Sequence, residues 1–149
     1  MSVNRPYASG DFAAVPAVLQ ADIPDRLVHR NVLGTGTAAD ADFSRQRSHL
    51  VKTVDLPSRV LSMTLGGLSP GQSTRRHRHN YETLIYVLQG QGQSTLGDRT
   101  VDWQAGDAFY VPVWAWHGHT NTGASEVVYV ACENAPHLQN LGVALREEY

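Results

Sequence analysis

Residues 71–90 of the chain read GQSTRRHRHNYETLIYVLQG, and residues 106–121 read GDAFYVPVWAWHGHTN. His77 and His79 stand one residue apart in the first stretch, and His117 lies in the second. Because successive side chains of a β-strand point to opposite faces, His77 and His79 face the same way on a strand. Two imidazoles on one strand and a third from a distant strand form a neutral ligand set suited to Fe, Mn, Co, Ni, Cu or Zn. The spacing therefore predicts a metal site.

From Ser48 onward, short β-rich runs alternate with turn residues. The runs predicted as strands are 50–54, 59–65, 83–88, 92–96, 99–103, 108–111, 117–120 and 126–131. Regular short strands separated by such turns favour an all-β barrel or sandwich. Before them, residues 11–20 are predicted to form a short helix interrupted near Pro16, with Asp11 as N-cap, and residues 33–43 to form a loop. The C-terminal residues 136–149 are predicted to end in a short helix or an extended arm.

Residues 71–90 resemble the first of two motifs of the cupin family, and residues 106–121 resemble the second. Gly106, Pro112, His117 and Asn121 stand at the cupin spacing, with Trp114 where the family often has glycine. The resemblance implies an all-β fold, a single cupin jelly-roll β-barrel over residues 46–135. An N-terminal arm with a short helix (1–45) and a C-terminal extension (136–149) complete the predicted organisation.

One position departs from the cupin pattern. Cupins commonly place a glutamate ligand seven residues before the glycine that closes the first motif, and this chain has Thr83 there, with Glu82 one residue earlier. A shift of one residue turns a side chain to the opposite face of a strand, so Glu82 reaches the metal only if a bulge re-aims it. We therefore expect three histidines and no carboxylate, and we keep Glu82 as a candidate catalytic residue.

Cupins without this glutamate include the gentisate 1,2-dioxygenase and salicylate dioxygenase group, which bind Fe(II) through three histidines. The His-Arg-His triplet and the Trp114-x-Trp116-His117-x-His119 pattern also resemble that group. The resemblance implies an Fe(II) dioxygenase acting on a small aromatic or enolisable hydroxy-carboxylate. Two alternatives stay open. One is a lyase, isomerase or decarboxylase that uses Zn(II), Mn(II) or Ni(II) as a Lewis acid, and the other is a non-catalytic small-molecule-binding cupin.

Strand alternation also predicts which side chains face the metal. His119 shares the face of His117 and is predicted either to orient substrate and transfer protons or to be a buried structural histidine. Trp114 and Trp116 are expected on the opposite face, outside the pocket, and Trp103 in the core. Arg75 shares the face of His77 and could clamp a carboxylate, unless it belongs to a solvated basic edge. The predicted substrate-binding residues are Arg75, Thr83, Ile85 and Met63.

The composition sets the remaining expectations. The chain has 149 residues, 12 basic and 14 acidic side chains and a formal charge of −2, without a long basic run for nucleic acid. The lone Cys132 cannot form an internal disulfide and is expected to be a small apolar residue at a strand end. No stretch has transmembrane length. We expect a cytoplasmic homodimer with a small-molecule substrate and no membrane or nucleic-acid partner.

Overall fold

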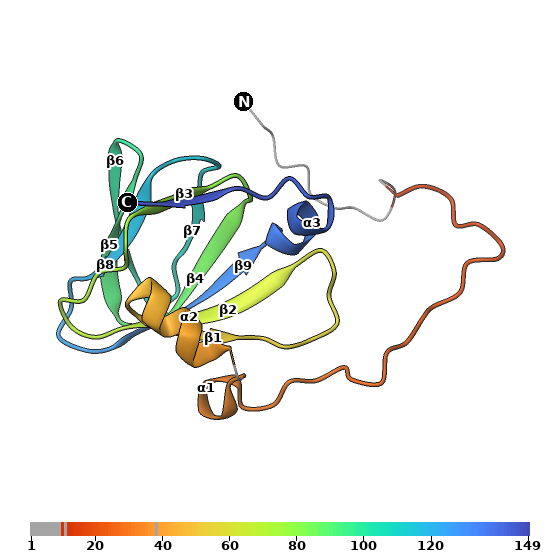
Figure 1. Cartoon of the computed structure of the whole chain (residues 1–149), viewed down its shortest axis with the longest axis horizontal. Coiled ribbons are helices and arrows are strands. Elements are labelled where there is room, and N and C mark those ends of the chain that lie inside the picture. Colours follow the sequence, from red (N-terminus) through yellow and green to blue (C-terminus); the bar gives the residue numbers. More distant parts are fainter. Residues whose placement is uncertain (1–9, 11, 38) are drawn as a thin grey trace.

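The structure is a computed structural model that describes residue 10, residues 12–37 and residues 39–149. In this part of the chain, three helices and ten strands follow in order (Figure 1). The elements are α1 (Val32–Thr35), α2 (Asp40–Arg47), β1 (Leu50–Thr53), β2 (Ser62–Leu68), β3 (His77–His79), β4 (Thr83–Gln89), β5 (Gln91–Leu96), β6 (Arg99–Gln104), β7 (Ala108–Val111), β8 (His117–Asn121), β9 (Val127–Glu133), α3 (Ala135–Asn140) and β10 (Arg146–Glu148). None of these helices is long and apolar enough to cross a membrane, within the residues described.

The strands form two five-stranded antiparallel sheets. Their orders are β1-β2-β9-β4-β7 and β10-β3-β8-β5-β6, so consecutive strands often lie in different sheets. Figure 1 shows β5, β6 and β8 grouped on one side of the molecule and β1, β2, β4 and β9 on the other. The predicted all-β cupin jelly roll is confirmed. The sheets are not closed into a continuous barrel, since no strand pairing of the described residues joins one sheet to the other.

The core lies between the sheets and follows strand alternation. Along β4, Thr83, Ile85 and Val87 are buried, whereas Leu84, Tyr86 and Leu88 between them are exposed. Buried apolar side chains of the other strands pack against this inner face: Leu68, Trp103, Val111, Val127, Tyr129 and Ala131. The prediction that Trp103 belongs to the core is confirmed.

The N-terminal helix prediction is wrong. Residues 12–20 form no helix, and Asp11, its predicted N-cap, lies outside the described residues. Pro16 removes an amide hydrogen from a segment too short to be helical without packing, and residues 12–28 are exposed. The helices α1 and α2 instead form where a loop was predicted, with α2 packed beside β1.

The C-terminal residues contain both predicted forms, because the helix α3 is followed by an extended segment that joins the second sheet. The strand β10 pairs antiparallel with β3, so that Arg146 lies opposite His79 and Glu148 opposite His77. This pairing places the end of the chain beside the two predicted metal ligands.

Candidate metal centre

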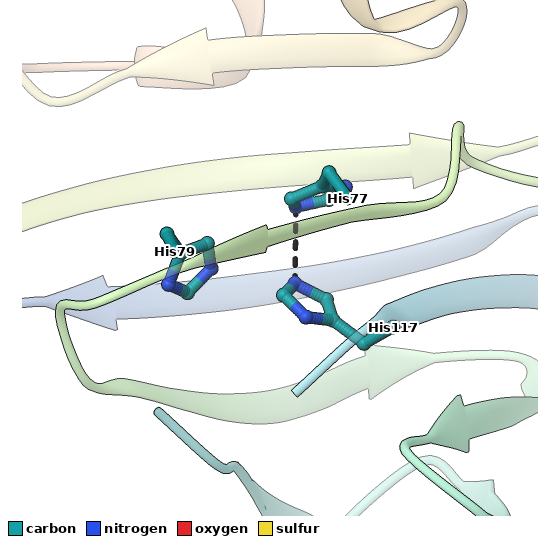
Figure 2. A group of neighbouring side chains, drawn as sticks. All are labelled: His77, His79 and His117. Carbon is teal, nitrogen blue, oxygen red and sulfur yellow. Dashed lines mark hydrogen bonds between the residues drawn. The ribbon is translucent and has the colours of Figure 1, made fainter. Parts of the chain in front are cut away.

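The three predicted ligands converge where β3 lies beside β8. His77 and His79 are on β3 and His117 is on β8, where it is the register partner of His77. The Nε2 atoms of His77 and His117 are 3.0 Å apart. One nitrogen from each of the three rings lies within 4.8 Å of the other two. Figure 2 shows the three rings turned toward a common point from the two strands.

Backbone carbonyl groups fix the orientation of all three rings. Nδ1 of His77 lies 2.9 Å from the Arg75 carbonyl oxygen, Nδ1 of His79 lies 2.9 Å from that of Tyr81, and Nδ1 of His117 lies 2.8 Å from that of Ala115. A carbonyl oxygen only accepts, so each Nδ1 donates its hydrogen. Each Nε2 then has a free lone pair, as in metal-binding histidines whose other nitrogen is held by a carbonyl.

The short contact between His77 and His117, drawn as a dashed line in Figure 2, follows from this arrangement. A neutral imidazole has one N–H, and both rings use it at Nδ1, so two lone pairs face each other at 3.0 Å. Two nitrogens that bind one ion at about 2.1 Å and at a right angle lie about 3.0 Å apart. The residues present therefore fit a divalent metal ion held by three histidines.

The surroundings keep the three rings neutral. Burial lowers the pKa of His77 to about 2 and that of His79 to about 4, and it also lowers the pKa of His117. The positive charge of Arg146 lowers the pKa of all three rings further. Neutral imidazole is the form that binds a metal ion.

The three rings line a cavity of about 50 Å³ between the sheets. Thr83 and Ile85, two of the predicted substrate-binding residues, also line this cavity, because they lie on the inner face of β4. Both were placed correctly from strand alternation.

Met63 was predicted on the wrong face. Met63 is 43% exposed, and the β2 residues that line the cavity are Thr64 and Gly66. The ring of Tyr129 lies over Gly66, where a Cβ would collide with it, so the small residues of β2 face inward. Side chains of this strand do alternate between the two faces, as predicted, but the even-numbered residues face inward rather than the odd-numbered ones.

Arg75 also lies outside the cavity. It is exposed and donates from Nε to the Ser48 hydroxyl at 3.0 Å. The strand β3 begins only at His77, so strand alternation does not extend back to Arg75. Arg75 is therefore not brought to the three histidines, and the role predicted for it, a carboxylate clamp at the mouth of the site, stays a prediction.

Glu82 does not approach the histidines. It is exposed and precedes β4, its N–H donates to Asn134 Oδ1 at 2.8 Å, and its carboxylate accepts a hydrogen bond from the Tyr110 hydroxyl at 3.4 Å. No bulge re-aims it. Among the described residues, the cluster consists of three histidines without a carboxylate, as expected, and a catalytic role for Glu82 is not supported.

His119 lines the cavity but is not one of the three converging rings. Its Nδ1 lies 2.7 Å from the Ser94 hydroxyl, which accepts a hydrogen bond from Trp103 Nε1 at 2.8 Å. Trp103 is only a donor, so the Ser94 hydroxyl keeps its own hydrogen and can donate it to Nδ1, in which case the hydrogen of His119 is on Nε2. Burial lowers the pKa of His119 to about 3, so the ring is neutral.

The two tryptophans of the second motif lie outside the pocket, as predicted. The Arg78 guanidinium lies 4.5 Å from the ring centre of Trp114 and 4.7 Å from that of Trp116. Trp114 has a φ of 62°, a left-handed conformation that favours glycine. This is the position where cupins often have glycine, so the backbone conformation persists here with a bulky residue.

Charged and aromatic cavity residues outside the two motifs were missed. They are Arg47, His49, Tyr129, Glu133 and Arg146. Glu133 lies opposite Thr83 in the sheet and accepts a hydrogen bond from its hydroxyl at 3.2 Å. Burial raises the pKa of Glu133. A signal for Glu133 existed, because it continues the inward alternation of Tyr129 and Ala131 two residues beyond the predicted strand. No local pattern identified the two arginines.

The comparisons with known proteins agree with this geometry. The cupin domain family matches residues 65–132. The chain is 34% identical over 115 residues to a 5-aminosalicylate 1,2-dioxygenase of Comamonas sp, covering 77% of this chain but 30% of that protein. It is 32% identical over 90 residues to the beta-alanine degradation protein BauB of Pseudomonas aeruginosa, covering 58% of this chain and 95% of that protein.

A crystal structure of a point mutant of the salicylate 1,2-dioxygenase from Pseudoaminobacter salicylatoxidans superposes with a TM-score of 0.63 at 21% identity. The match covers 67% of this chain and 32% of that chain, and it supports the fold alone. The chain thus spans about a third of the length of the dioxygenases that it matches.

Proposed function

Because the chain belongs to the cupin superfamily, we propose that it is a non-haem Fe(II)-dependent dioxygenase acting on a small aromatic or enolisable hydroxy-carboxylate. The observation that carries the proposal is the convergence of three neutral histidine Nε2 atoms at one point, without a carboxylate in the cluster among the described residues. The similarity to a dioxygenase of an aminosalicylate supports it.

Three uncharged ligands have a direct chemical consequence. They leave the positive charge of a divalent ion uncompensated, so an anionic substrate is attracted to the open side of the site. A bound Fe(II) ion supplies the redox chemistry with dioxygen that Zn(II) cannot supply. We therefore propose iron as the native metal, with Mn(II), Ni(II) or Zn(II) as ions that the same histidines can hold.

The residues of the chain then bind and orient the substrate. Ile85, Val111 and Ala131 provide apolar walls beside the three histidines, against which the metal-facing end of the substrate can pack. His119 is held by Ser94 and presents its Nε2–H to the cavity, where it can donate to an oxygen of the substrate. We propose that this hydrogen bond is how His119 fulfils its predicted catalytic role of orienting the substrate. The homodimer and the cytoplasmic location remain predictions.

The test is reconstitution of the full chain with Fe(II) without oxygen, followed by measurement of oxygen uptake with salicylate, gentisate and 5-aminosalicylate. We expect oxygen consumption with at least one of them and loss of the aromatic absorbance. His117→Ala and the Zn(II)-loaded protein are the controls, and both should consume no oxygen. Absence of oxygen uptake by the iron-loaded protein with every hydroxybenzoate would refute the proposal. Conversion of a substrate by the Zn(II) form without oxygen would select the Lewis-acid alternative.

A further inference from the structure

The cavity at the three histidines is too small to enclose a ring-sized substrate. Its volume is about 50 Å³, about a third of the volume of an engineered cavity that binds benzene, about 150 Å³. We call this space the inner cavity. It has room for the polar end of a substrate, and the rest of the molecule must lie elsewhere.

A larger pocket of about 340 Å³ adjoins the inner cavity. We call it the outer pocket. Four residues line both spaces, Arg47, Thr64, Glu133 and Arg146. The outer pocket extends from these residues between α2, α3 and the segment that leads into β10, where Ala144 forms part of its wall. The two spaces therefore meet at a junction that carries two guanidinium groups and one carboxyl group.

Arg146 is fixed at this junction by contacts that connect it to a metal ligand. It lies opposite His79 across the β10–β3 pair. Its Nη1 donates to the Tyr81 hydroxyl at 3.2 Å. The Tyr81 ring stacks on the His79 imidazole with a centroid distance of 3.8 Å and an interplanar angle of 1°. The guanidinium thus lies one aromatic ring away from the metal ligand, facing the route between the two spaces.

The second hydrogen bond of Arg146 involves a replaceable partner. Its Nη2 donates to Glu148 Oε1 at 2.9 Å, and the two side chains are 25% and 34% exposed. A partly exposed pair two residues apart on one strand is held weakly. A guanidinium has five N–H donors in a planar fork that matches a carboxylate, so a substrate carboxylate can replace that of Glu148.

The charges at the junction favour an anion. Arg47 and Arg146 contribute two positive charges, the Glu148 carboxylate offsets one of them, and burial raises the pKa of Glu133, the carboxyl group in the shared wall. A partly closed space with excess positive charge attracts a carboxylate.

We infer that Arg146 is the residue that binds the substrate carboxylate, in exchange for Glu148, while the ring of the substrate occupies the outer pocket and its carboxylate and hydroxyl end faces the histidines. This inference rests on the proposed function and deepens it, because it assigns substrate recognition to the C-terminal strand, outside both cupin motifs. It defines the substrate as a ring-sized molecule with an acid group beside its metal-binding oxygen.

The first test measures binding without turnover. The full chain is loaded with Zn(II), and the dissociation constants of salicylate and of phenol, which lacks the carboxylate, are measured by calorimetry. Arg146→Gln should weaken salicylate binding between about 10-fold and 100-fold, as expected for loss of a charged hydrogen bond, and should leave phenol binding and zinc content unchanged. Arg99→Gln, the same charge change at an exposed residue of β6, should leave both unchanged.

Glu148→Gln distinguishes this role from a purely structural one. Removal of the competing carboxylate should tighten salicylate binding several-fold, an effect that distortion of β10 would not produce. The inference is overturned if Arg146→Gln binds salicylate as tightly as the wild type, if Glu148→Gln weakens binding, or if the wild type binds no hydroxybenzoate.

The second test fills the outer pocket. Ala144→Phe should weaken salicylate binding at least 10-fold and leave binding of the compact hydroxy-acid glycolate unchanged. Ala124→Phe, on an exposed turn away from both spaces, is the matched control. Unchanged salicylate affinity in Ala144→Phe would overturn the placement of the ring.

These outcomes can be separated from failure of the proposed function. Salicylate binding that depends on Arg146, without oxygen uptake by the iron-loaded wild type, would refute the proposed dioxygenase activity and leave the role of Arg146 in carboxylate binding intact. Oxygen uptake with the same KM in the wild type and in Arg146→Gln would refute the role of Arg146 in carboxylate binding and leave the proposed dioxygenase activity intact.

Discussion

The buried carboxyl group of Asp40 should make the free energy of unfolding depend on pH. The residue is 2% exposed, and its carboxylate joins the first turn of α2 to β1. It accepts hydrogen bonds from the N–H and the hydroxyl of Thr37 and from the N–H and the hydroxyl of Thr53. Burial by itself would raise the pKa of Asp40, but these four hydrogen bonds outweigh it and lower the pKa to about 2.

The lowered pKa sets both the size and the sign of the effect. A drop from 3.8 to about 2 corresponds to at most about 2.5 kcal/mol of stabilisation of the folded state. Because the folded pKa lies below the unfolded value, this contribution is complete above pH 3.8 and is lost as the pH falls through about 2. About half of it should remain at pH 3.

The perturbation is Asp40→Asn, measured by urea unfolding at pH 7 and pH 3. The amide replaces one accepting oxygen with a donor and cannot serve all four hydrogen bonds. We expect the variant to be about 2 kcal/mol less stable than the wild type at pH 7, with a clearly smaller deficit at pH 3. Asp42→Asn, in the same helix but with a side chain 60% exposed, should cost less than about 0.5 kcal/mol. An Asp40→Asn deficit that is equal at both pH values, or a comparable cost for Asp42→Asn, would contradict this reasoning.

Three further changes test other parts of the structure. His117→Ala should remove the bound metal, whereas Glu82→Gln should leave the metal content unchanged, because, of these two residues, only His117 belongs to the cluster. Elemental analysis of protein loaded with Fe(II) or Zn(II) measures both effects. Gly66→Ala should lower stability by about 1–3 kcal/mol in urea unfolding, because its Cβ would collide with the Tyr129 ring; an unchanged midpoint would show that this ring moves freely. Leu84→Lys should shift the predicted homodimer toward monomer in light scattering, because Leu84 is 60% exposed on the apolar outer face of β4; an unchanged mass would place the contact elsewhere.

Two of the three clustered histidines could be predicted from local geometry alone. His77 and His79 lie on one strand, where alternation alone fixes their common face. His117 required the resemblance to the cupin motif, since no local rule states that β8 lies beside β3. Thr83 and Ile85 followed from the same alternation, because β4 is long and regular.

The errors arose where alternation was extended beyond a regular strand or lacked a fixed phase. Arg75 precedes β3, so its direction depends on the loop and on Ser48 rather than on strand geometry. Met63 lies on a real strand, but only the position of Tyr129 above Gly66 shows which face of that strand is inward. Such contacts join residues far apart in sequence, and a local pattern does not contain them.

The roles proposed here divide metal binding from substrate recognition. The three histidines come from the two cupin motifs, and their orientation depends on nearby backbone carbonyl groups. The charged residues at the junction come instead from the end of α2, the end of β9 and the strand β10, all outside those motifs. On these proposed roles, changes in the three elements alter the choice of substrate without disturbing the metal. For this reason, similarity confined to the motifs supports the metal chemistry of a relative more strongly than its choice of substrate.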